Sequence, residues 1–263
     1  TLMAQRQTQW PYAMTAGTTH DTKRGEDVRA RISVLAEVPR LWTDALERLL
    51  ELVPLPDPGF ANLLWQAIVG VWPAERDRLA GYAEKAMREA GDRTSWTKPD
   101  AEYEAAVLAA VDAANDSAEV RTVLQGVVDA IAPHGWSNAL AAKLLDLTVP
   151  GVPDLYQGSE LWELSLVDPD NRRPVDFAAR ASLLAKVRTG ARPPLPSGLD
   201  DGAAKLLLCH QALTLRRDRP ELFAGYSPLV ADGPAADHLL AFDRGGAISV
   251  ATRLPVGLAA NGG

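Results

Sequence analysis

Apolar residues recur at steps of three and four positions through most of the stretch from residue 27 to residue 149. This spacing places them on one face of a helix, so it predicts a mainly helical segment. We expect Gly91 to cap one helix and Pro133 to end another. The helices are expected at about 41–53, 60–71, 73–90, 99–114 and 118–131, then around Leu140 to Leu145, and later at about 177–187 and 203–217.

Strand-like patterns are few and short. Residues 152–156 are apolar and interrupted by Pro153, which predicts a buried strand, and residues 12–17 suggest the end of another. After Pro220 the chain becomes β-rich, with expected strands at 238–244, 247–253 and 253–258 and a hairpin turn at 244–246. A complete (β/α)8 barrel, at about 250 residues, has eight strands that alternate with helices. Before residue 224 the pattern shows only one strand and the end of another, so these 263 residues do not encode a complete barrel.

The two ends of the sequence resemble places where longer elements are interrupted. Residues 1–17 read as the entry into an element already under way, and the sequence stops at a turn, Asn261-Gly262-Gly263, with no strand after it. We therefore expect this sequence to be part of a longer chain.

Composition indicates a globular, soluble protein. Hydrophobic residues make up 47% of the chain and charged residues 23%, which excludes a disordered or fibrous class. The net charge of −7 provides no basic face, so we expect neither nucleic acid nor an anionic membrane as a partner. No apolar run reaches the roughly 18 residues of a membrane span, and no signal peptide opens the sequence.

Common cofactor and metal motifs are missing from the sequence. It has no glycine-rich phosphate loop, and Cys209 is its single cysteine, expected on a buried helix face. One thiol cannot form an internal disulfide, which suits a reducing cytoplasm. The four histidines, at positions 20, 134, 210 and 238, are scattered. We expect no cofactor, no metal site and a cytoplasmic location.

The segment from Thr19 to Arg31 carries most of the candidate chemistry and has two interpretations. It could be a solvated loop followed by a helix start, with Glu26 and Asp27 favouring the helix dipole and pairing with Arg29 and Arg31. Alternatively, an apolar stretch, then small residues, then His20-Asp21 is how a barrel strand delivers polar groups to its catalytic end.

Two strings resemble the last two strand regions of glycoside hydrolase family 13, the α-amylase superfamily. They are HDTKRGEDVRARI, from residue 20, and TVPGVPDLYQGSELWELSLVDPDNRRPVD, from residue 148. In this order they are similar to the glucosylmutases of that family, and the resemblance extends from about Gly17 to the C-terminus. It implies the C-terminal portion of a barrel with an inserted helical subdomain and a truncated antiparallel β-domain. The segments are a strand end and loop (1–38), the inserted helices (39–132), the last barrel strand with helices (133–219) and the β-domain (220–263).

The resemblance also implies site residues. Asp21 matches the third catalytic carboxylate of the family, which would bind hydroxyls of the sugar at the cleavage point, and His20 would bind the same sugar. Lys23 and Arg24 either hold an acceptor glucose or are only solvated. The next strand carries Tyr156, Gln157 and Glu160 at its mouth, where Tyr156 either stacks on sugar or packs in the wall. The last candidates are Arg172 and Arg173, which with Asp168 and Asp170 either line the cleft or brace each other.

The implied reaction is intramolecular transglycosylation on maltooligosaccharides, converting the reducing-end α-1,4 linkage to the α,α-1,1 linkage of trehalose. A retaining mechanism needs a nucleophile and an acid/base carboxylate about 5–5.5 Å apart, and the family takes both from earlier strands that this sequence lacks. We therefore expect the fragment alone to be inactive and the helices at 40–130 to act as a lid.

Two alternative functions stay open at this point. The first is an α-glucan hydrolase of the same superfamily. The second is a non-catalytic helical module that binds glucans or other partners, suggested by seven tryptophans among amphipathic helices. We expect Trp65 and Trp72 to lie in the core rather than to bind sugar, because they sit at helical spacing.

Overall fold

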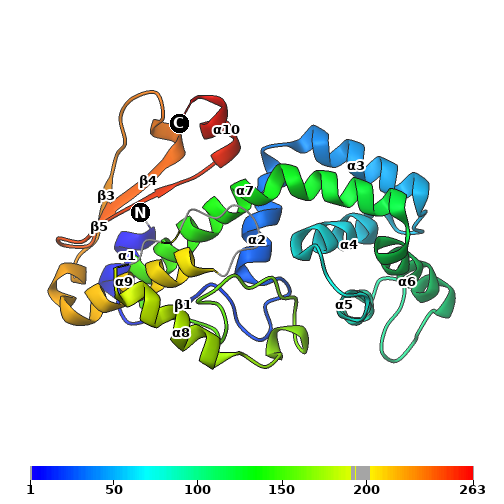
Figure 1. Ribbon diagram of the computed structural model, residues 1–263, viewed down its shortest axis with the longest axis horizontal. Coiled ribbons are helices and arrows are strands. Elements are labelled where there is room, and N and C mark those ends of the chain that lie inside the picture. Colours follow the sequence, from blue (N-terminus) through cyan, green and yellow to red (C-terminus); the bar gives the residue numbers. More distant parts are fainter. Residues whose placement is uncertain (1, 191–192, 194–201, 263) are drawn as a thin grey trace.

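A computed structural model describes residues 2–190, 193 and 202–262. The proline-rich stretch 191–198, whose composition predicts a linker or exposed loop, lies outside these residues except for Pro193. The protein is mainly helical, with a small antiparallel sheet near its C-terminus (Figure 1). The helices are α1 (Leu2–Gln9), α2 (Glu26–Ser33), α3 (Pro39–Leu52), α4 (Pro58–Val71), α5 (Arg76–Ala90), α6 (Ala101–Asp116), α7 (Ala118–Thr148), α8 (Phe177–Arg188), α9 (Ala203–Asp218) and α10 (Pro255–Ala260). The strands are β1 (Met14–Ala16), β2 (Val152–Asp154), β3 (Ser227–Leu229), β4 (Leu239–Asp243) and β5 (Ile248–Thr252).

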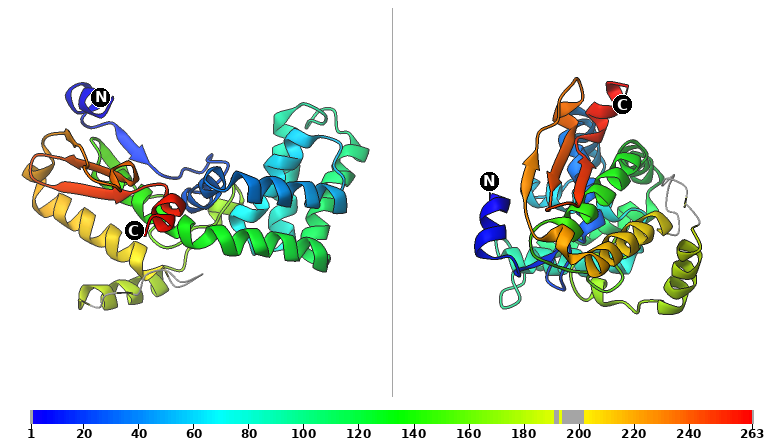
Figure 2. Two further views of the ribbon diagram at one scale, coloured as in Figure 1. Left: turned by 90° about the horizontal axis from the view of Figure 1, so that it is seen from above. Right: turned by 90° about the vertical axis from the view of Figure 1, so that its left-hand side faces the viewer.

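Helices α2 to α7 share one hydrophobic core. Trp65 is fully buried and Trp72 is 5% exposed, which confirms that these tryptophans belong to the core. The long helix α7 contacts α2, α3, α9 and β5, so it joins the helical bundle to the sheet at the opposite end of the molecule (Figures 1 and 2). None of the helices in the described ranges is both long and apolar enough to cross a membrane.

Helix ends in this bundle follow from side-chain caps. Asp57 accepts hydrogen bonds from the backbone N–H of Gly59 and Phe60 at the start of α4, and Asp100 caps α6 in the same way. Gly91 ends α5 with φ of 73°, a left-handed conformation that glycine adopts without a Cβ clash. The predicted cap at Gly91 is therefore confirmed.

Pro133 does not end a helix, contrary to the sequence prediction. It lies inside α7, and the predicted boundary between residues 132 and 133 therefore falls within one continuous helix. Proline removes one backbone donor, but Pro133 is exposed, while Ile131 and Trp136 on either side of it are buried against neighbouring elements. Tertiary packing on both sides keeps the helix continuous.

Strands β1 and β2 form a parallel pair. Met14 pairs with Val152, Thr15 with Pro153 and Ala16 with Asp154, so both predicted strand regions are confirmed. The expected burial of the second strand is wrong, because Val152 is 45% exposed and the other two residues of β2 are half-buried. The chain between them forms helices α2 to α7, which are inserted between two neighbouring parallel strands.

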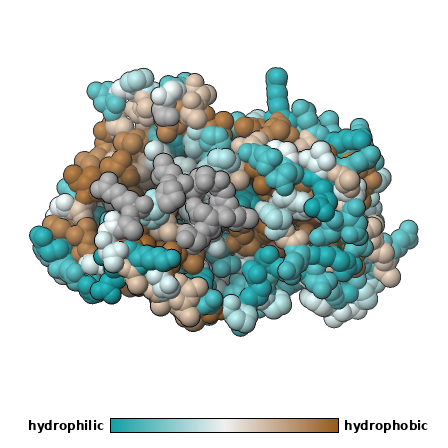
Figure 3. Space-filling view, viewed as in Figure 1, coloured by the Kyte–Doolittle hydropathy of each residue, from teal (hydrophilic) through white to brown (hydrophobic). Residues whose placement is uncertain are grey.

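The C-terminal sheet has the order β3-β4-β5 and is antiparallel throughout. The predicted hairpin of β4 and β5 is confirmed, but residues 253–258 are not a strand: they lead into the short helix α10, because Pro255 takes its first turn and has no N–H for a ladder. Figure 3 shows apolar side chains over the part of the molecule that contains this sheet, where Leu240, Ile248 and Val250 are exposed.

Arg244 fastens the hairpin to the rest of the molecule. Its guanidinium is buried and donates to the carbonyl oxygens of Thr148 and Phe223 and to Oε1 of Gln7. Burial lowers the pKa of Arg244 to about 10. One side chain therefore ties the β4–β5 turn to α1 and to the end of α7.

Candidate functional site

His20 and Asp21 lie in a turn that follows β1. The side chain of Asp21 is 72% exposed and that of His20 is 56% exposed, with 3.7 Å between His20 Nε2 and Asp21 Oδ2. The turn closes on itself, because the Thr22 N–H donates to the Thr19 carbonyl and the Thr22 hydroxyl accepts from the Thr19 N–H at 2.8 Å. The carboxylate of Asp21 therefore faces solvent from a well-defined backbone.

The segment 163–171 holds this turn in place. Nδ2 of Asn171, a buried side chain, donates to the carbonyl oxygens of Thr19 (3.2 Å) and His20 (2.9 Å). The N–H of Asp168 donates to the same His20 carbonyl, and that of Gly25 donates to the Ser165 carbonyl at 2.9 Å. The two strings that carried the resemblance are thus in direct contact.

Lys23 and Arg24 reach toward the helical bundle. Lys23 Nζ lies 2.7 Å from Oε2 of Glu89 on α5, and this hydrogen bond raises the pKa of Lys23. Arg24 donates to the Leu63 carbonyl on α4 at 2.8 Å. Both residues also line a cavity between this turn and the two helices. Their expected contact with an acceptor glucose stays a prediction.

Asp168 and Asp170 each form ion pairs with basic side chains. Arg172 and Arg173 provide some of these pairs, and helix α5 provides the others. Arg172 lies 3.4 Å from Asp168, and Arg173 lies 3.2 Å from Asp170, in the bracing arrangement. Shorter contacts come from α5, where Lys85 Nζ lies 2.6 Å from Asp168 and Arg78 makes two hydrogen bonds to Asp170.

These pairings set the charge of the two aspartates. The hydrogen bond from Lys85 lowers the pKa of Asp168. Burial raises the pKa of Asp170, but the hydrogen bonds from Arg78 and the Leu166 N–H, together with the charges of Arg78 and Arg173, outweigh it, so the net direction is downward. Both carboxylates stay ionised at neutral pH and fix segment 163–171 to α5.

Tyr156, Gln157 and Glu160 follow β2. Tyr156 is half-buried, Gln157 is exposed, and Glu160 forms an ion pair with Arg180 on α8. Arg180 also donates to the Gly158 carbonyl at 3.2 Å, so this loop is fastened to α8. Contact of these three residues with sugar stays a prediction.

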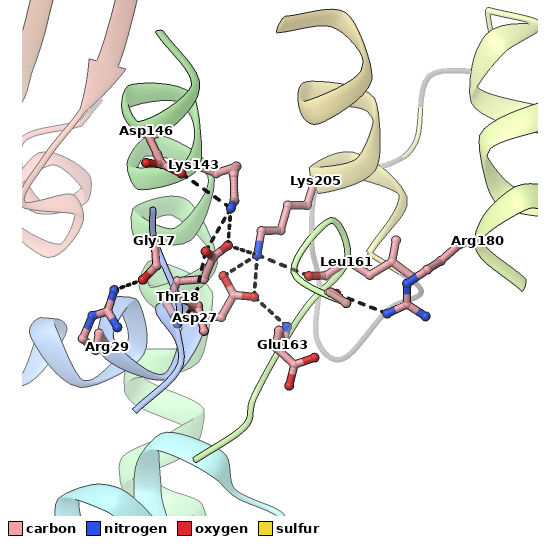
Figure 4. Close-up of polar contacts among 12 residues, drawn as sticks. Gly17, Thr18, Asp27, Arg29, Lys143, Asp146, Leu161, Glu163, Arg180 and Lys205 are labelled. Atoms are coloured by element: carbon pink, nitrogen blue, oxygen red, sulfur yellow. Dashed lines mark hydrogen bonds and ion pairs between the residues drawn. The ribbon is translucent and has the colours of Figure 1, made fainter. Parts of the chain in front are cut away.

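A buried ionic network lies directly behind the turn, and sequence reasoning missed it. Lys143 Nζ on α7 and Lys205 Nζ on α9 lie 2.7 and 2.6 Å from Oε1 of Glu26. Lys205 also lies 2.8 Å from Oδ2 of Asp27, and all four side chains are at most 9% exposed. Figure 4 shows the two lysines converging from different helices.

The expected pairing of Glu26 and Asp27 with Arg29 and Arg31 is wrong. Arg29 donates to the carbonyl oxygens of Gly17 and Arg24, and Arg31 donates to those of Val69 and Trp72. Each arginine therefore satisfies backbone carbonyls, and the two carboxylates turn inward to the lysines. The available signal was a single lysine within each of two apolar stretches, LAAKLL and AAKLLL.

Lys205 connects three segments of the site. It contacts both carboxylates of α2 and donates to the Leu161 carbonyl at 3.2 Å, while Asp27 accepts from the Glu163 N–H at 2.7 Å (Figure 4). Burial lowers the pKa of Lys205, but the charges of Asp27 and Glu26 and the hydrogen bonds to them raise it by more. The net direction is upward, so the ammonium stays charged. The helix that follows the His20-Asp21 turn is thereby fixed to the loop that follows β2.

The arrangement can supply one solvent-facing carboxylate on a fixed backbone. Such a group accepts hydrogen bonds from ligand hydroxyls and stabilises nearby positive charge. The neighbouring carboxylates of Asp168, Asp170 and Glu89 are each held by a lysine or arginine of α5 or of the turn. Among the described residues there is no cluster of His, Cys, Asp and Glu that could hold a metal ion.

Comparisons with known proteins identify the relatives of this chain. A Mycobacterium tuberculosis protein named "Putative maltooligosyl trehalose synthase" is 48% identical over 269 residues, covering 98% of this chain and 33% of the relative. The structure of maltooligosyltrehalose synthase from Arthrobacter ramosus is 52% identical with a TM-score of 0.95, covering 100% of this chain and 34% of that one. A further structure titled maltooligosyl trehalose synthase is 29% identical with a TM-score of 0.84, over 95% of this chain and 36% of that one.

These matches cover almost all of the chain but only part of each relative. No family model matches the sequence. The chain spans about one third of the length of the curated relatives and of the solved structures it resembles. It is therefore a homologue of about one third of a maltooligosyl trehalose synthase.

Proposed function

We propose that this chain forms the part of a maltooligosyl trehalose synthase that carries the third catalytic carboxylate, Asp21. The observation that carries the proposal is the turn at 19–22, in which Asp21 is exposed while Asn171 fixes the backbone on both sides of His20. A carboxylate that must discriminate between two states of a sugar ring has to be presented rigidly, because loose groups lose most of their effect.

Asp21 would act through hydrogen bonds to hydroxyls of the sugar at the cleavage point. These bonds strengthen as the ring flattens toward an oxocarbenium ion, and contributions of this kind reach several kcal/mol. Its negative charge also stabilises the developing positive charge. His20 would contact the same sugar, since its ring is exposed beside Asp21.

The nucleophile and the acid/base would come from the part of the relatives that this chain does not cover. In this proposal, β1 and β2 are two adjacent strands of a (β/α)8 barrel, and helices α3 to α6 extend from the connection between them. The parallel register of β1 and β2 supports that placement, because consecutive barrel strands pair in parallel. The isolated chain would then lack turnover.

The reaction would transfer a glucosyl unit within one maltooligosaccharide, moving its reducing-end linkage from α-1,4 to α,α-1,1. Such a transfer competes with hydrolysis, so water must be kept from the reacting centre. Lys23 and Arg24 of the turn bond to α5 and α4, and Lys85 of α5 bonds to Asp168 in segment 163–171. These contacts place α4 and α5 beside the turn, which supports a role for the two helices as a lid.

A fusion protein tests this function. This chain would replace the matching third of the Arthrobacter ramosus enzyme, to which it is 52% identical, and the fusion would be incubated with maltopentaose. We expect a non-reducing product that ends in trehalose, and no turnover by the isolated chain. Release of glucose or maltose instead would assign the chain to the α-glucan hydrolases of the superfamily.

A further inference from the structure

Arg78 of α5 joins the beginning and the end of segment 163–171. Its Nε donates to Oδ1 of Asp170 at 2.7 Å, and its Nη2 donates to Oδ2 of Asp170 at 3.0 Å and to the Leu164 carbonyl at 2.8 Å. The side chains of Arg78 and Asp170 are 18% and 9% exposed. A guanidinium can make these bonds together because its N–H groups form a rigid planar fork. One side chain of the helical bundle therefore closes the segment into a loop.

The carboxylate of Asp170 also orders the segment from within. Its Oδ2 accepts from the Leu166 N–H at 2.8 Å, and the N–H of Asp170 donates to the Val167 carbonyl at 3.1 Å. Arg173 lies 3.2 Å from Asp170 as well, but it follows Asp170 closely along the chain and so cannot tie the segment to another element. Arg78 is therefore the residue that fixes this carboxylate to the bundle.

The loop that Arg78 closes makes the hydrogen bonds that hold the turn. The Ser165 carbonyl accepts from the Gly25 N–H at 2.9 Å, and the Asp168 N–H donates to the His20 carbonyl at 3.4 Å. Asn171, at the end of the segment, donates to the same His20 carbonyl at 2.9 Å. A shift of the segment would therefore move the backbone that carries His20 and the residue after it.

We propose that Arg78 is a positioning residue for the reaction, because it closes segment 163–171 and thereby holds Asp21 where the sugar requires it. Its bonds reach the segment rather than the substrate-facing side chains, so it acts through the backbone of the turn. The reaction rests on the proposed function, whereas the tie rests on contacts within this chain. A displacement of about 1 Å caused by a change far from the chemistry can cost about 100-fold in rate. A residue of the inserted helices would thus help to set the rate without contacting the sugar.

Amide exchange in the isolated chain tests the tie without any need for activity. Lysine keeps the positive charge of Arg78 but replaces the planar fork by a single nitrogen, so it cannot make the same set of bonds. Arg78→Lys should accelerate exchange at Gly25 and Asp168, whose N–H groups join the turn to the segment, roughly five- to hundredfold. Arg76→Lys is the matched control, since Arg76 also lies on α5 and is 2.6 Å from Asp112 but is 50% exposed. It should leave both rates unchanged.

Kinetics of the fusion protein with maltopentaose separate positioning from a purely structural role. The measurements would be made at a temperature where thermal unfolding shows every variant to be folded. Arg78→Lys should lower kcat roughly 10- to 100-fold and change KM by less than about twofold, because Asp21 acts mainly on the transition state. Arg76→Lys should retain both constants.

Three results would each overturn the positioning role of Arg78. They are unchanged exchange at Gly25 and Asp168, faster exchange confined to amides of α5, and an unchanged kcat in Arg78→Lys. Absence of activity in the fusion protein without substitutions would instead contradict the proposed function. The exchange rates at Gly25 and Asp168 would still decide whether Arg78 holds the segment.

Discussion

The ammonium of Lys205 lies 2.8 Å from the carboxylate of Asp27, although the two residues are 178 positions apart, and neither side chain is more than 1% exposed. Glu26 and Lys143 complete the network. Lys205 of α9 contacts both carboxylates of α2 and the Leu161 carbonyl in the loop after β2. The network therefore positions the backbone on both sides of the candidate site.

Lys205→Met should therefore destabilise the protein strongly. Removing one partner of a buried ion pair leaves a charge without compensation, which costs about 3–5 kcal/mol. Urea unfolding would measure the loss. Lys186→Met on α8, where the lysine is exposed, is the control and should change the free energy of unfolding by less than about 0.5 kcal/mol. Equal stabilities of the two variants would refute a structural role for the network.

Asn171→Ala should loosen the turn at 19–22. It deletes two hydrogen bonds to the turn, together contributing about 1–3 kcal/mol. Amide exchange at Thr22 and Asp168, whose N–H groups bond to the turn, should accelerate roughly five- to hundredfold. Asn115→Ala removes a side-chain bond within α6 and should leave those two rates unchanged. If both variants behave alike, Asn171 does not position the turn.

Two glycines of α7 should respond in opposite directions to substitution. A Cβ at Gly135 would lie 2.9 Å from Cα of Arg31 on α2, so Gly135→Ala should destabilise by about 1–3 kcal/mol. A Cβ at Gly126 would meet nothing within 4 Å, and Gly126→Ala should stabilise by about 0.5–1 kcal/mol through helix propensity. Thermal unfolding of the two variants would show the contrast, and the same sign for both would contradict the close packing of α2 on α7.

The pair of Arg88 and Glu104 predicts a pH dependence of stability. Hydrogen bonds from Arg88 and Thr94 lower the pKa of Glu104 to about 2, from 4.5. A carboxyl with a lowered pKa in the folded state stabilises the protein above its unfolded pKa, and this contribution disappears as the pH falls through the folded pKa. The unchanged chain should thus have a larger free energy of unfolding than Glu104→Gln above pH 4.5, and this difference should vanish toward pH 2. Glu102→Gln, at an exposed position of the same turn, should show no such trend in urea unfolding.

The sequence could predict features that depend on local chemistry. Helix spacing, the glycine cap at Gly91 and the β4–β5 hairpin were predicted correctly, because each is specified by neighbouring residues. The helix ending expected at Pro133 was wrong, since burial of Ile131 and Trp136 outweighs the local effect of a proline. The strand expected at 253–258 was wrong for a local reason, because Pro255 fits the first turn of a helix.

The candidate site was only partly accessible from the sequence. His20 and Asp21 could be named as candidates because their motif is contiguous, and their role in the site stays a prediction. Partners that come from distant elements were not found: Lys205 reaches Asp27 from α9, and Asn171 reaches the carbonyl of His20. In addition, charged residues near a helix start are usually solvated, so nothing local indicated that Glu26 and Asp27 would be buried.

The most direct test of the account is Asp21→Asn in the fusion protein, in which this chain replaces the matching third of the Arthrobacter ramosus enzyme. The change removes the charge from an exposed side chain, so folding should be unaffected. Formation of the trehalose-ended product from maltopentaose should fall at least roughly 100-fold, the scale of losing a preorganised electrostatic contact. Asp44→Asn, on an exposed position of α3, should retain full activity. Near-normal product formation by Asp21→Asn would contradict the central claim.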